Sequence, residues 1–133
     1  MREPDLRKVT IIGAGNVGAT IAYAMAIEGI ANSIVIIDIK KDKAEGEAMD
    51  ITQGSPFFKG TRVISGDYKD AVDSDIVIIT SGVARKAGQS RLDLAQTNVN
   101  ILKSIAKEIT AYAPDAIYLL ISNPVDVLTY VFN

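Results

Sequence analysis

Residues 8–18 read Lys-Val-Thr-Ile-Ile-Gly-Ala-Gly-Asn-Val-Gly, and this stretch decides the fold. The β-branched run at 9–12 predicts a buried strand, and a helix-forming run follows the glycines. A strand, a GxGxxG turn and a helix in this order are typical of a dinucleotide site. There Gly13 permits the tight turn, Gly15 lets a pyrophosphate approach the backbone, and Gly18 lets the helix pack closely on the strand. A GxGxxG turn alone is a weak signal, so the prediction depends on what surrounds it.

An acidic residue stands where the ribose of a dinucleotide would need one. The apolar run 33–37 predicts a second strand, and Asp38 follows it, about 20 residues after the glycines. A carboxylate at this place accepts hydrogen bonds from the adenosine ribose and repels the 2′-phosphate of NADP, which favours NAD. Lys40, Lys41 and Lys43 lie nearby in the sequence and would soften that repulsion. The alternative is an acid in an ordinary surface turn.

The composition is that of one globular domain. The chain has 133 residues, 48% of them hydrophobic and 23% charged, with a net charge of −2. This charge argues against a nucleic-acid groove, and the longest apolar runs are strand-sized rather than membrane-spanning. We expect a cytoplasmic protein, because residues 1–5 contain no apolar signal-peptide segment. The chain has no cysteine and no histidine, so we expect no metal site and no histidine acid/base in these residues.

Apolar runs alternate with helix-forming segments along the whole chain. We expect strands at 9–12, 34–37, 62–65, 75–80 and 116–121, a turn at 66–70, and helices at 16–28, 44–51, 92–112 and 125–132. This alternation predicts an α/β fold with a doubly wound parallel sheet. Ligands bind such sheets outside the carboxyl ends of the strands, so the candidate sites are 13–18, 38, 81–91 and 122–126.

Two of these places carry side chains suited to a small anion. Arg85 and Arg91 lie in a polar loop hinged by Gly82 and Gly88, and an arginine fork suits a carboxylate or a polarised carbonyl. Such a loop could close over a substrate; the alternative is two solvated surface charges. Asn123 ends the fifth predicted strand and could bond a substrate oxygen, or could simply form an Asn-Pro turn.

Two further features have two interpretations each. Tyr68 could stack beside an adenine or cover the sheet edge. The helix at 44–51 has an apolar face of small residues with Met49 beside it, which suits either an ordinary surface helix or contact with a partner subunit.

Five motifs stand in order from Lys8 onward. They are Val-Thr-Ile-Ile-Gly-Ala-Gly-Asn-Val-Gly (9–18), Gly-Glu-Ala-Met-Asp-Ile (46–51), Gly-Asp-Tyr (66–68), Arg-Leu-Asp-Leu-Ala-Gln-Thr-Asn-Val (91–99) and Ser-Asn-Pro-Val-Asp-Val-Leu-Thr-Tyr (122–130). Together they resemble the amino-terminal, NAD-binding half of the lactate and malate dehydrogenases, over essentially the whole chain. The resemblance implies a Rossmann fold, NAD as cofactor, a 2-oxo or 2-hydroxy acid as substrate, and a homo-oligomer, most often a tetramer.

The resemblance also assigns roles to individual residues. Arg91 matches the mobile-loop arginine that polarises the substrate carbonyl, and Asn123 matches the asparagine that orients the same oxygen. Arg85, Arg91, Asn123 and Asp126 would contact substrate. The implied cofactor contacts are Gly13, Gly15, Asn16, Val17, Gly18, Asp38, Lys43, Tyr68, Gly82, Val83, Ser104, Ile121, Ser122 and Asn123.

Arg85 departs from the lactate pattern. The family's discriminating position in this loop is usually glutamine in lactate enzymes and arginine in malate enzymes, since a guanidinium can pair with the second carboxylate of oxaloacetate. The motifs at 46–51, 91–99 and 122–130 favour the lactate branch, in which pyruvate from glycolysis and L-lactate are interconverted. We therefore expect a lactate enzyme, with malate as the alternative.

The family's catalytic histidine, its orienting aspartate and the arginine that binds the substrate carboxylate belong to the carboxyl-terminal half. We expect residues 1–133 to be one NAD-binding domain that ends inside a helix, without the catalytic substrate domain and without turnover of its own. The competing hypothesis is a stand-alone NAD-binding module with no chemistry.

Overall fold

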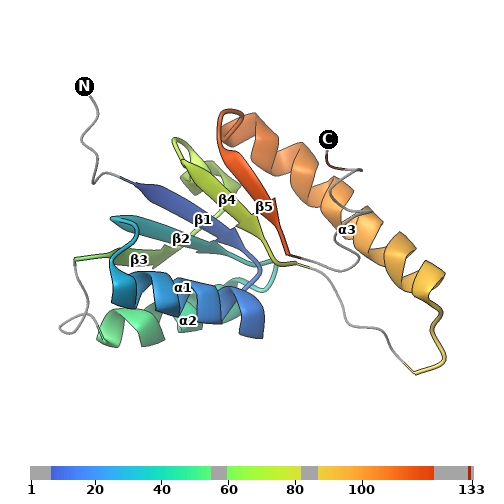
Figure 1. Cartoon of the computed structure of the whole chain (residues 1–133), viewed down its shortest axis with the longest axis horizontal. Coiled ribbons are helices and arrows are strands. Elements are labelled where there is room, and N and C mark those ends of the chain that lie inside the picture. The colour runs from blue at the N-terminus through green and yellow to red at the C-terminus, as the bar shows by residue number, and fades with distance from the viewer. Residues whose placement is uncertain (1–6, 55–59, 82–86, 122–131, 133) are drawn as a thin grey trace.

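The computed structural model describes residues 7–54, 60–81, 87–121 and 132. Five strands form one parallel sheet: β1 (Lys8–Ile12), β2 (Ser33–Ile37), β3 (Arg62–Ser65), β4 (Ile76–Ile79) and β5 (Ile117–Leu120). The strand order is β3-β2-β1-β4-β5, so the chain starts in the middle of the sheet and winds outward in both directions (Figure 1). The doubly wound α/β fold expected from the sequence is confirmed.

In the part of the chain that the structure describes, three long α-helices cover the two faces of the sheet. They are α1 (Asn16–Glu28), α2 (Lys41–Gln53) and α3 (Arg91–Tyr112), and a short 3₁₀ helix, η2 (Tyr68–Ala71), follows β3. Figure 1 shows α1 and α2 along one side of the sheet and α3 along the other.

Alternating strand residues supply the two cores, because successive side chains of a strand point to opposite faces. One core joins side chains of β1, β2, β3 and β4 to α1 and α2: Val9, Ile11, Ile34, Ile36, Val63 and Ile78 with Ala22, Ala26, Ala44, Ala48 and Ile51. The other core joins the intervening strand residues to α3: Ile12, Val35, Ile37, Val77 and Ile79 with Leu102, Ile105 and Ile109. Both faces of the central strands are therefore apolar, as the unbroken β-branched runs predict.

Local signals account for most element ends. Gly29 follows α1 with a φ of 65°, and its N–H donates to the carbonyl of Ala26, so this glycine ends the helix as expected. Ser90 caps α3 by accepting a hydrogen bond from the Asp93 N–H, and the Asp93 side chain accepts one in return from the Ser90 N–H. Pro114 lies just beyond the last residue of α3.

Three expectations need adjustment or fall outside the described residues. The second helix is longer than the predicted 44–51 and begins at Lys41. The predicted turn at 66–70 contains the start of η2, with Asp67 and Asp70 in a capping box. The helix expected at 125–132 lies almost wholly outside the described residues.

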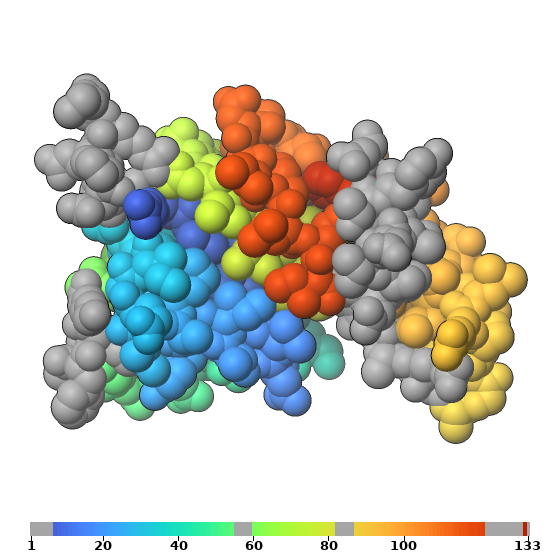
Figure 2. Space-filling model, viewed as in Figure 1, coloured from blue at the N-terminus to red at the C-terminus, as the bar shows by residue number. Residues whose placement is uncertain are grey.

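The face of β5 that lies on the α1 side of the sheet is apolar and exposed. Ile117, Leu119 and Ile121 are 65%, 46% and 42% exposed, whereas Tyr118 and Leu120 pack toward α3. Figure 2 shows the orange-red atoms of β5 at the surface beside the blue atoms of α1. Within the described ranges, no helix is long and apolar enough to cross a membrane.

Candidate functional site

The glycine-rich turn crosses the carboxyl ends of three neighbouring strands. The N–H of Gly13 donates to the carbonyl of Ile37 at 2.7 Å, and the hydroxyl of Thr80 lies within 3.2 Å of the Gly13 carbonyl. Gly13 has a φ of +112°, and a Cβ there would lie 2.5 Å from Thr80 Oγ1. Both the conformation and the space therefore require glycine at this position.

Gly18 brings α1 against the turn. A Cβ at Gly18 would lie 1.8 Å from the Gly13 carbonyl oxygen, a distance that no real side chain can adopt. The close approach of helix and turn that the GxGxxG spacing predicts is therefore present. Its consequence is that the first turn of α1 points its N–H groups toward the carboxyl edge of the sheet.

Gly15 is open where Gly18 is crowded. A Cβ built on Gly15 meets no atom within 4 Å, and its φ of −75° suits any residue. Gly15 is also the N-cap of α1 and supplies no side chain to the unpaired N–H groups of the first helical turn. Free N–H donors, a positive helix end and empty space above the backbone together form a cradle for phosphate oxygens.

The carboxylate of Asp38 is held by two backbone donors. Oδ2 accepts a hydrogen bond from the Ala14 N–H at 2.7 Å, and Oδ1 accepts one from the Lys40 N–H at 2.8 Å. Because each carboxylate oxygen can accept a second hydrogen bond, both retain capacity for ribose hydroxyls. Asp38 thus ties the phosphate cradle to the start of α2, a structural role that its position in the sequence did not reveal.

Tyr68 lies close enough to Asp38 for the carboxylate charge to affect the pKa of its hydroxyl. Burial raises the pKa of the Tyr68 hydroxyl above 10.0, and the carboxylates of Glu108 and Asp38 raise it further. The side chain packs against the core that α3 shares with the sheet. This packing agrees with the hypothesis that Tyr68 covers the sheet edge. Its proposed stacking on an adenine stays a prediction.

The other predicted site residues are scattered or lie outside the described ranges. Asn16 and Val17 are exposed at the start of α1, Lys43 is exposed on α2, and Arg91 and Ser104 are exposed on α3. Ile121 is exposed just after β5, and six predicted contacts lie outside the described residues: Gly82, Val83, Arg85, Ser122, Asn123 and Asp126. The site that the structure brings together is therefore the phosphate and ribose end, from Gly13 to Gly18 with Asp38.

Sequence reasoning missed two contributors to this site. Thr80 lies behind the turn and donates to the backbone of β1, at 3.1 Å from the Ile12 carbonyl. Asp67 pairs with Lys41, with 3.0 Å between Oδ1 and Nζ. Thr80 could have been noticed in the sequence, because it is the polar residue that ends an apolar strand. The pair of Lys41 and Asp67 could not, because no local pattern connects residues that are 26 positions apart.

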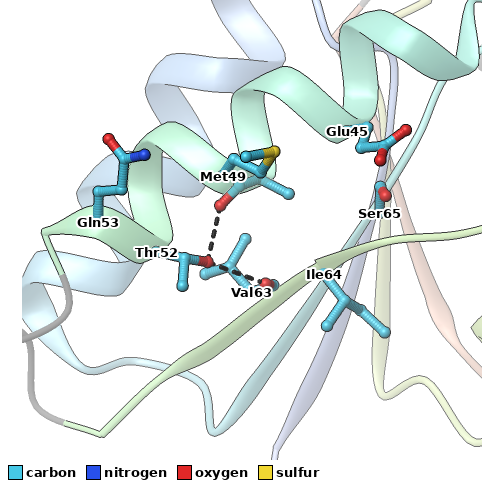
Figure 3. A pocket seen from close by; sticks show the side chains of 8 residues that line it. Glu45, Met49, Thr52, Gln53, Val63, Ile64 and Ser65 are labelled. Atoms are coloured by element: carbon cyan, nitrogen blue, oxygen red, sulfur yellow. Dashed lines mark hydrogen bonds between the residues drawn. The ribbon is translucent and has the colours of Figure 1, made fainter.

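A separate hollow lies between α2 and β3. Its volume is about 370 Å³, and it is lined by side chains of those two elements alone, with Met49, Thr52 and Ile64 among them (Figure 3). The Thr52 hydroxyl donates to the Ala48 carbonyl at 2.7 Å and lies 3.3 Å from the Val63 carbonyl, so this hydroxyl is already paired. The lining residues of this hollow include no glycine-rich turn and no helix N-terminus, the features that hold the phosphates of a dinucleotide.

A family model described as lactate/malate dehydrogenase, NAD binding domain, matches residues 7–133. The chain belongs to this family. Its match to the NAD-binding domain of lactate/malate dehydrogenases agrees with the cradle at Gly15 and the carboxylate of Asp38, and NAD is the cofactor that this domain binds. The resemblance and the fold inferred from the five motifs are thereby confirmed.

Two curated L-lactate dehydrogenases are similar to this chain. An L-lactate dehydrogenase of Clostridium botulinum (strain Loch Maree) is 52% identical over 131 residues, which are 98% of this chain and 41% of the relative. An L-lactate dehydrogenase of Clostridium perfringens (strain SM101) is 55% identical over 124 residues, 93% of this chain and 39% of that relative. The chain thus spans about two fifths of the length of the curated lactate dehydrogenases it matches.

Solved structures include both branches of the family. The minor L-lactate dehydrogenase from Enterococcus mundtii, in a ligands-bound form, superposes with a TM-score of 0.92 and 47% identity over 96% of this chain and 41% of its own. The malate dehydrogenase from Picrophilus torridus superposes with a TM-score of 0.89 and 36% identity over 95% of this chain and 41% of its own. The fold is therefore common to both branches and does not separate lactate from malate.

Proposed function

We propose that this chain is the NAD-binding part of an L-lactate dehydrogenase, an enzyme that interconverts pyruvate and L-lactate with NADH and NAD. One observation carries the cofactor side: the open N-terminus of α1 at Gly15 and the half-satisfied carboxylate of Asp38 lie at the same edge of the sheet. The identity to curated L-lactate dehydrogenases supports the substrate side. NAD supplies the hydride acceptor, and NADH the hydride donor.

The residues of this chain would bind and orient the cofactor. The N–H groups of Asn16 and Val17 at the start of α1 would hold the pyrophosphate, since no side chain caps them from Gly15. Asp38 would accept hydrogen bonds from the adenosine ribose through the free lone pairs of its two oxygens. Lys43 and Ser104, exposed on α2 and α3, and Ile121 would complete the cofactor contacts, as the family resemblance implies.

Two residues would act on the substrate. Arg91 would polarise the 2-oxo group and stabilise the negative charge that develops on its oxygen, and Asn123 would orient the same oxygen. Arg91 is exposed in the first turn of α3, free of the packed core, which is compatible with a residue that reaches toward a bound substrate. Asp126 would line the substrate site beside them.

Malate dehydrogenase is the second candidate, because Arg85 carries the residue type that binds the second carboxylate of oxaloacetate. A steady-state comparison of pyruvate and oxaloacetate with a full-length protein carrying this segment would separate the two. If Arg85 discriminates between the substrates, Arg85→Gln should raise kcat/KM for pyruvate relative to kcat/KM for oxaloacetate. An unchanged ratio of kcat/KM for the two substrates would refute a discriminating role.

We further propose that residues 1–133 do not turn over substrate alone, because they contain no histidine to carry the proton. Measured reduction of pyruvate by this chain, free of contaminating enzyme, would refute this. In the whole protein we propose a cytoplasmic homo-oligomer, a tetramer, acting on the pyruvate of glycolysis. The exposed face of β5 and Met49 on α2 are among the exposed apolar surfaces that suit contact with further protein.

Calorimetric titration with NADH tests the cofactor proposal. We expect saturable one-to-one binding by the wild type and loss of binding by Gly15→Val, whose side chain fills the space over the cradle. Asp38→Asn keeps an acceptor for the Ala14 N–H and should weaken binding without unfolding the chain. Absence of NADH binding by a wild-type chain that is folded by circular dichroism would refute a self-sufficient cofactor site. Binding of NADH by a full-length protein that lacks any dehydrogenase activity would instead favour the stand-alone NAD-binding module.

A further inference from the structure

Three lysines, Lys40, Lys41 and Lys43, closely follow Asp38 in the sequence. Lys40 donates its backbone N–H to Asp38, and Lys41 and Lys43 follow it in the first turn of α2. A free ammonium group in this region would attract the 2′-phosphate that distinguishes NADP from NAD, and would oppose the repulsion by Asp38. The arrangement of these cations therefore affects which dinucleotide binds.

Lys41 forms an ion pair at the surface, where its side chain is 75% exposed and that of Asp67 is 49% exposed. Its Nζ lies 3.0 Å from Oδ1 of Asp67, in the segment that follows β3. Lys41 and Asp67 also border the same polar hollow of about 200 Å³, between the start of α2 and the end of β3. The pair thus joins the first turn of α2 to the segment after β3, at the carboxyl edge of the sheet where we propose that the cofactor binds.

Asp67 is itself fixed in place. It is the N-cap of η2, where its side chain accepts a hydrogen bond from the Asp70 N–H, and its own N–H donates to Asp70 Oδ2 at 2.8 Å. Asp70 lies against Gly66, where a Cβ would come within 2.6 Å of Asp70 Oδ2. The capping box therefore presents one oxygen of Asp67 to Lys41 from a defined position.

We propose that Asp67 is a specificity-determining residue that favours NAD over NADP by pairing with Lys41. The pairing neutralises Lys41 and directs its ammonium group toward β3, so the negative charge of Asp38 dominates at the ribose. Asp67 acts through Lys41 and is a positioning residue, without contact to the cofactor. The inference rests on the proposed NAD site, and it adds a determinant outside the ribose-binding carboxylate.

The discriminating variant is Asp67→Asn. Asparagine caps helices as well as aspartate does and keeps an oxygen for the Asp70 N–H, but it releases Lys41. We expect the affinity for NADPH to rise roughly two- to fivefold, the range of an exposed ion pair, while the affinity for NADH stays within about twofold. The gain should shrink as salt is raised from about 0.01 M to 0.5 M, because exposed charges are screened.

Two further variants separate pairing from net charge. Asp42→Asn removes one negative charge from the same helical turn without touching the pair and should leave the NADPH/NADH ratio unchanged. The double variant with Lys41→Met and Asp67→Asn should lose the gain. Titrations with 2′,5′-ADP and 5′-AMP, followed by calorimetry and by the thermal shift each ligand causes, repeat the comparison without the nicotinamide.

The outcomes are distinct. A wild type that binds no NADH refutes the proposed NAD site. A wild type that binds NADH, with Asp67→Asn showing no gain for NADPH or 2′,5′-ADP, or with an equal gain in Asp42→Asn or in the double variant, refutes only the role of Asp67. If Asp67→Asn does not fold, Asp67→Ser provides the same test, since serine also caps helices.

Discussion

Alanine at Gly18 should lower stability, whereas alanine at Gly15 should lower NADH affinity and leave stability nearly unchanged, although the two glycines belong to one motif. The ideal Cβ at Gly18 would lie 1.8 Å from the carbonyl oxygen of Gly13 and 3.0 Å from Thr80 Oγ1. The obstacle is backbone held by the Gly13–Ile37 hydrogen bond at 2.7 Å, so it cannot turn aside as a flexible side chain could. The helix must therefore move away from the turn to admit a methyl group.

The magnitude follows from two opposing terms. Inserting a methyl group into packed structure costs about 1–3 kcal/mol, and more when the contact is backbone. The higher helix propensity of alanine relative to glycine stabilises the folded state by up to about 1 kcal/mol, and by less in the first turn of a helix. We expect Gly18→Ala to lose about 2 kcal/mol of unfolding free energy, which lowers Tm by roughly 6–8 °C for a domain of this size.

The matched variant, Gly15→Ala, should leave stability nearly unchanged. Its Cβ meets nothing within 4 Å. Alanine is a poorer N-cap than glycine by roughly 0.5–1 kcal/mol. It also lowers the conformational entropy of the unfolded chain, which stabilises the folded state by about 0.4–1 kcal/mol, so the two effects offset each other. NADH affinity should nevertheless fall at least about tenfold, because the methyl group stands where the pyrophosphate approaches.

Thermal and urea unfolding followed by circular dichroism, with NADH titration of each variant, measures both effects. A Gly18→Ala protein as stable as the wild type would refute the close helix–turn contact. Unaltered NADH affinity in Gly15→Ala would show that the phosphate does not use the open side of this turn.

Three further predictions concern other parts of the structure. Asp38→Ala should lower the unfolding free energy by about 1–3 kcal/mol, because it leaves the buried Ala14 N–H without its acceptor, whereas Asp38→Asn should lose less; urea melts of both check this. Burial raises the pKa of Tyr118 above 10.0, so stability should persist below pH 10 and fall as pH rises further; Tyr118→Phe should flatten that fall in melts from pH 8 to 11. Leu119→Lys puts a charge on the exposed apolar face of β5, so it should disfavour self-association through that face and raise the monomer fraction of the isolated chain in sedimentation velocity. Thr110→Lys, on the exposed side of α3, should leave the monomer fraction unchanged.

The main strands and helices could be predicted because their causes are local. The strand at 62–65 agrees with β3, and the helix at 16–28 agrees with α1, since β-branched runs and glycine boundaries act over a few residues. The start of α2 at Lys41 was missed because no side chain caps it: its N-cap, Lys40, makes no capping hydrogen bond. The N–H of Lys40 bonds Asp38 instead, which connects this helix to the preceding strand.

The sequence by itself determined the doubly wound sheet, the glycine turn and the acid at position 38. The alternation of apolar segments and the steric freedom of glycine are local properties, which do not depend on how distant parts of the chain pack. Only the tertiary structure decided which glycine is crowded and which is open, and that Asp38 supports the Ala14 N–H. It also decided that Asp67 reaches Lys41 across 26 residues. Contacts of this kind depend on which strand ends the fold brings together, and the parallel pairing of β3, β2, β1 and β4 places these ends at one edge of the sheet.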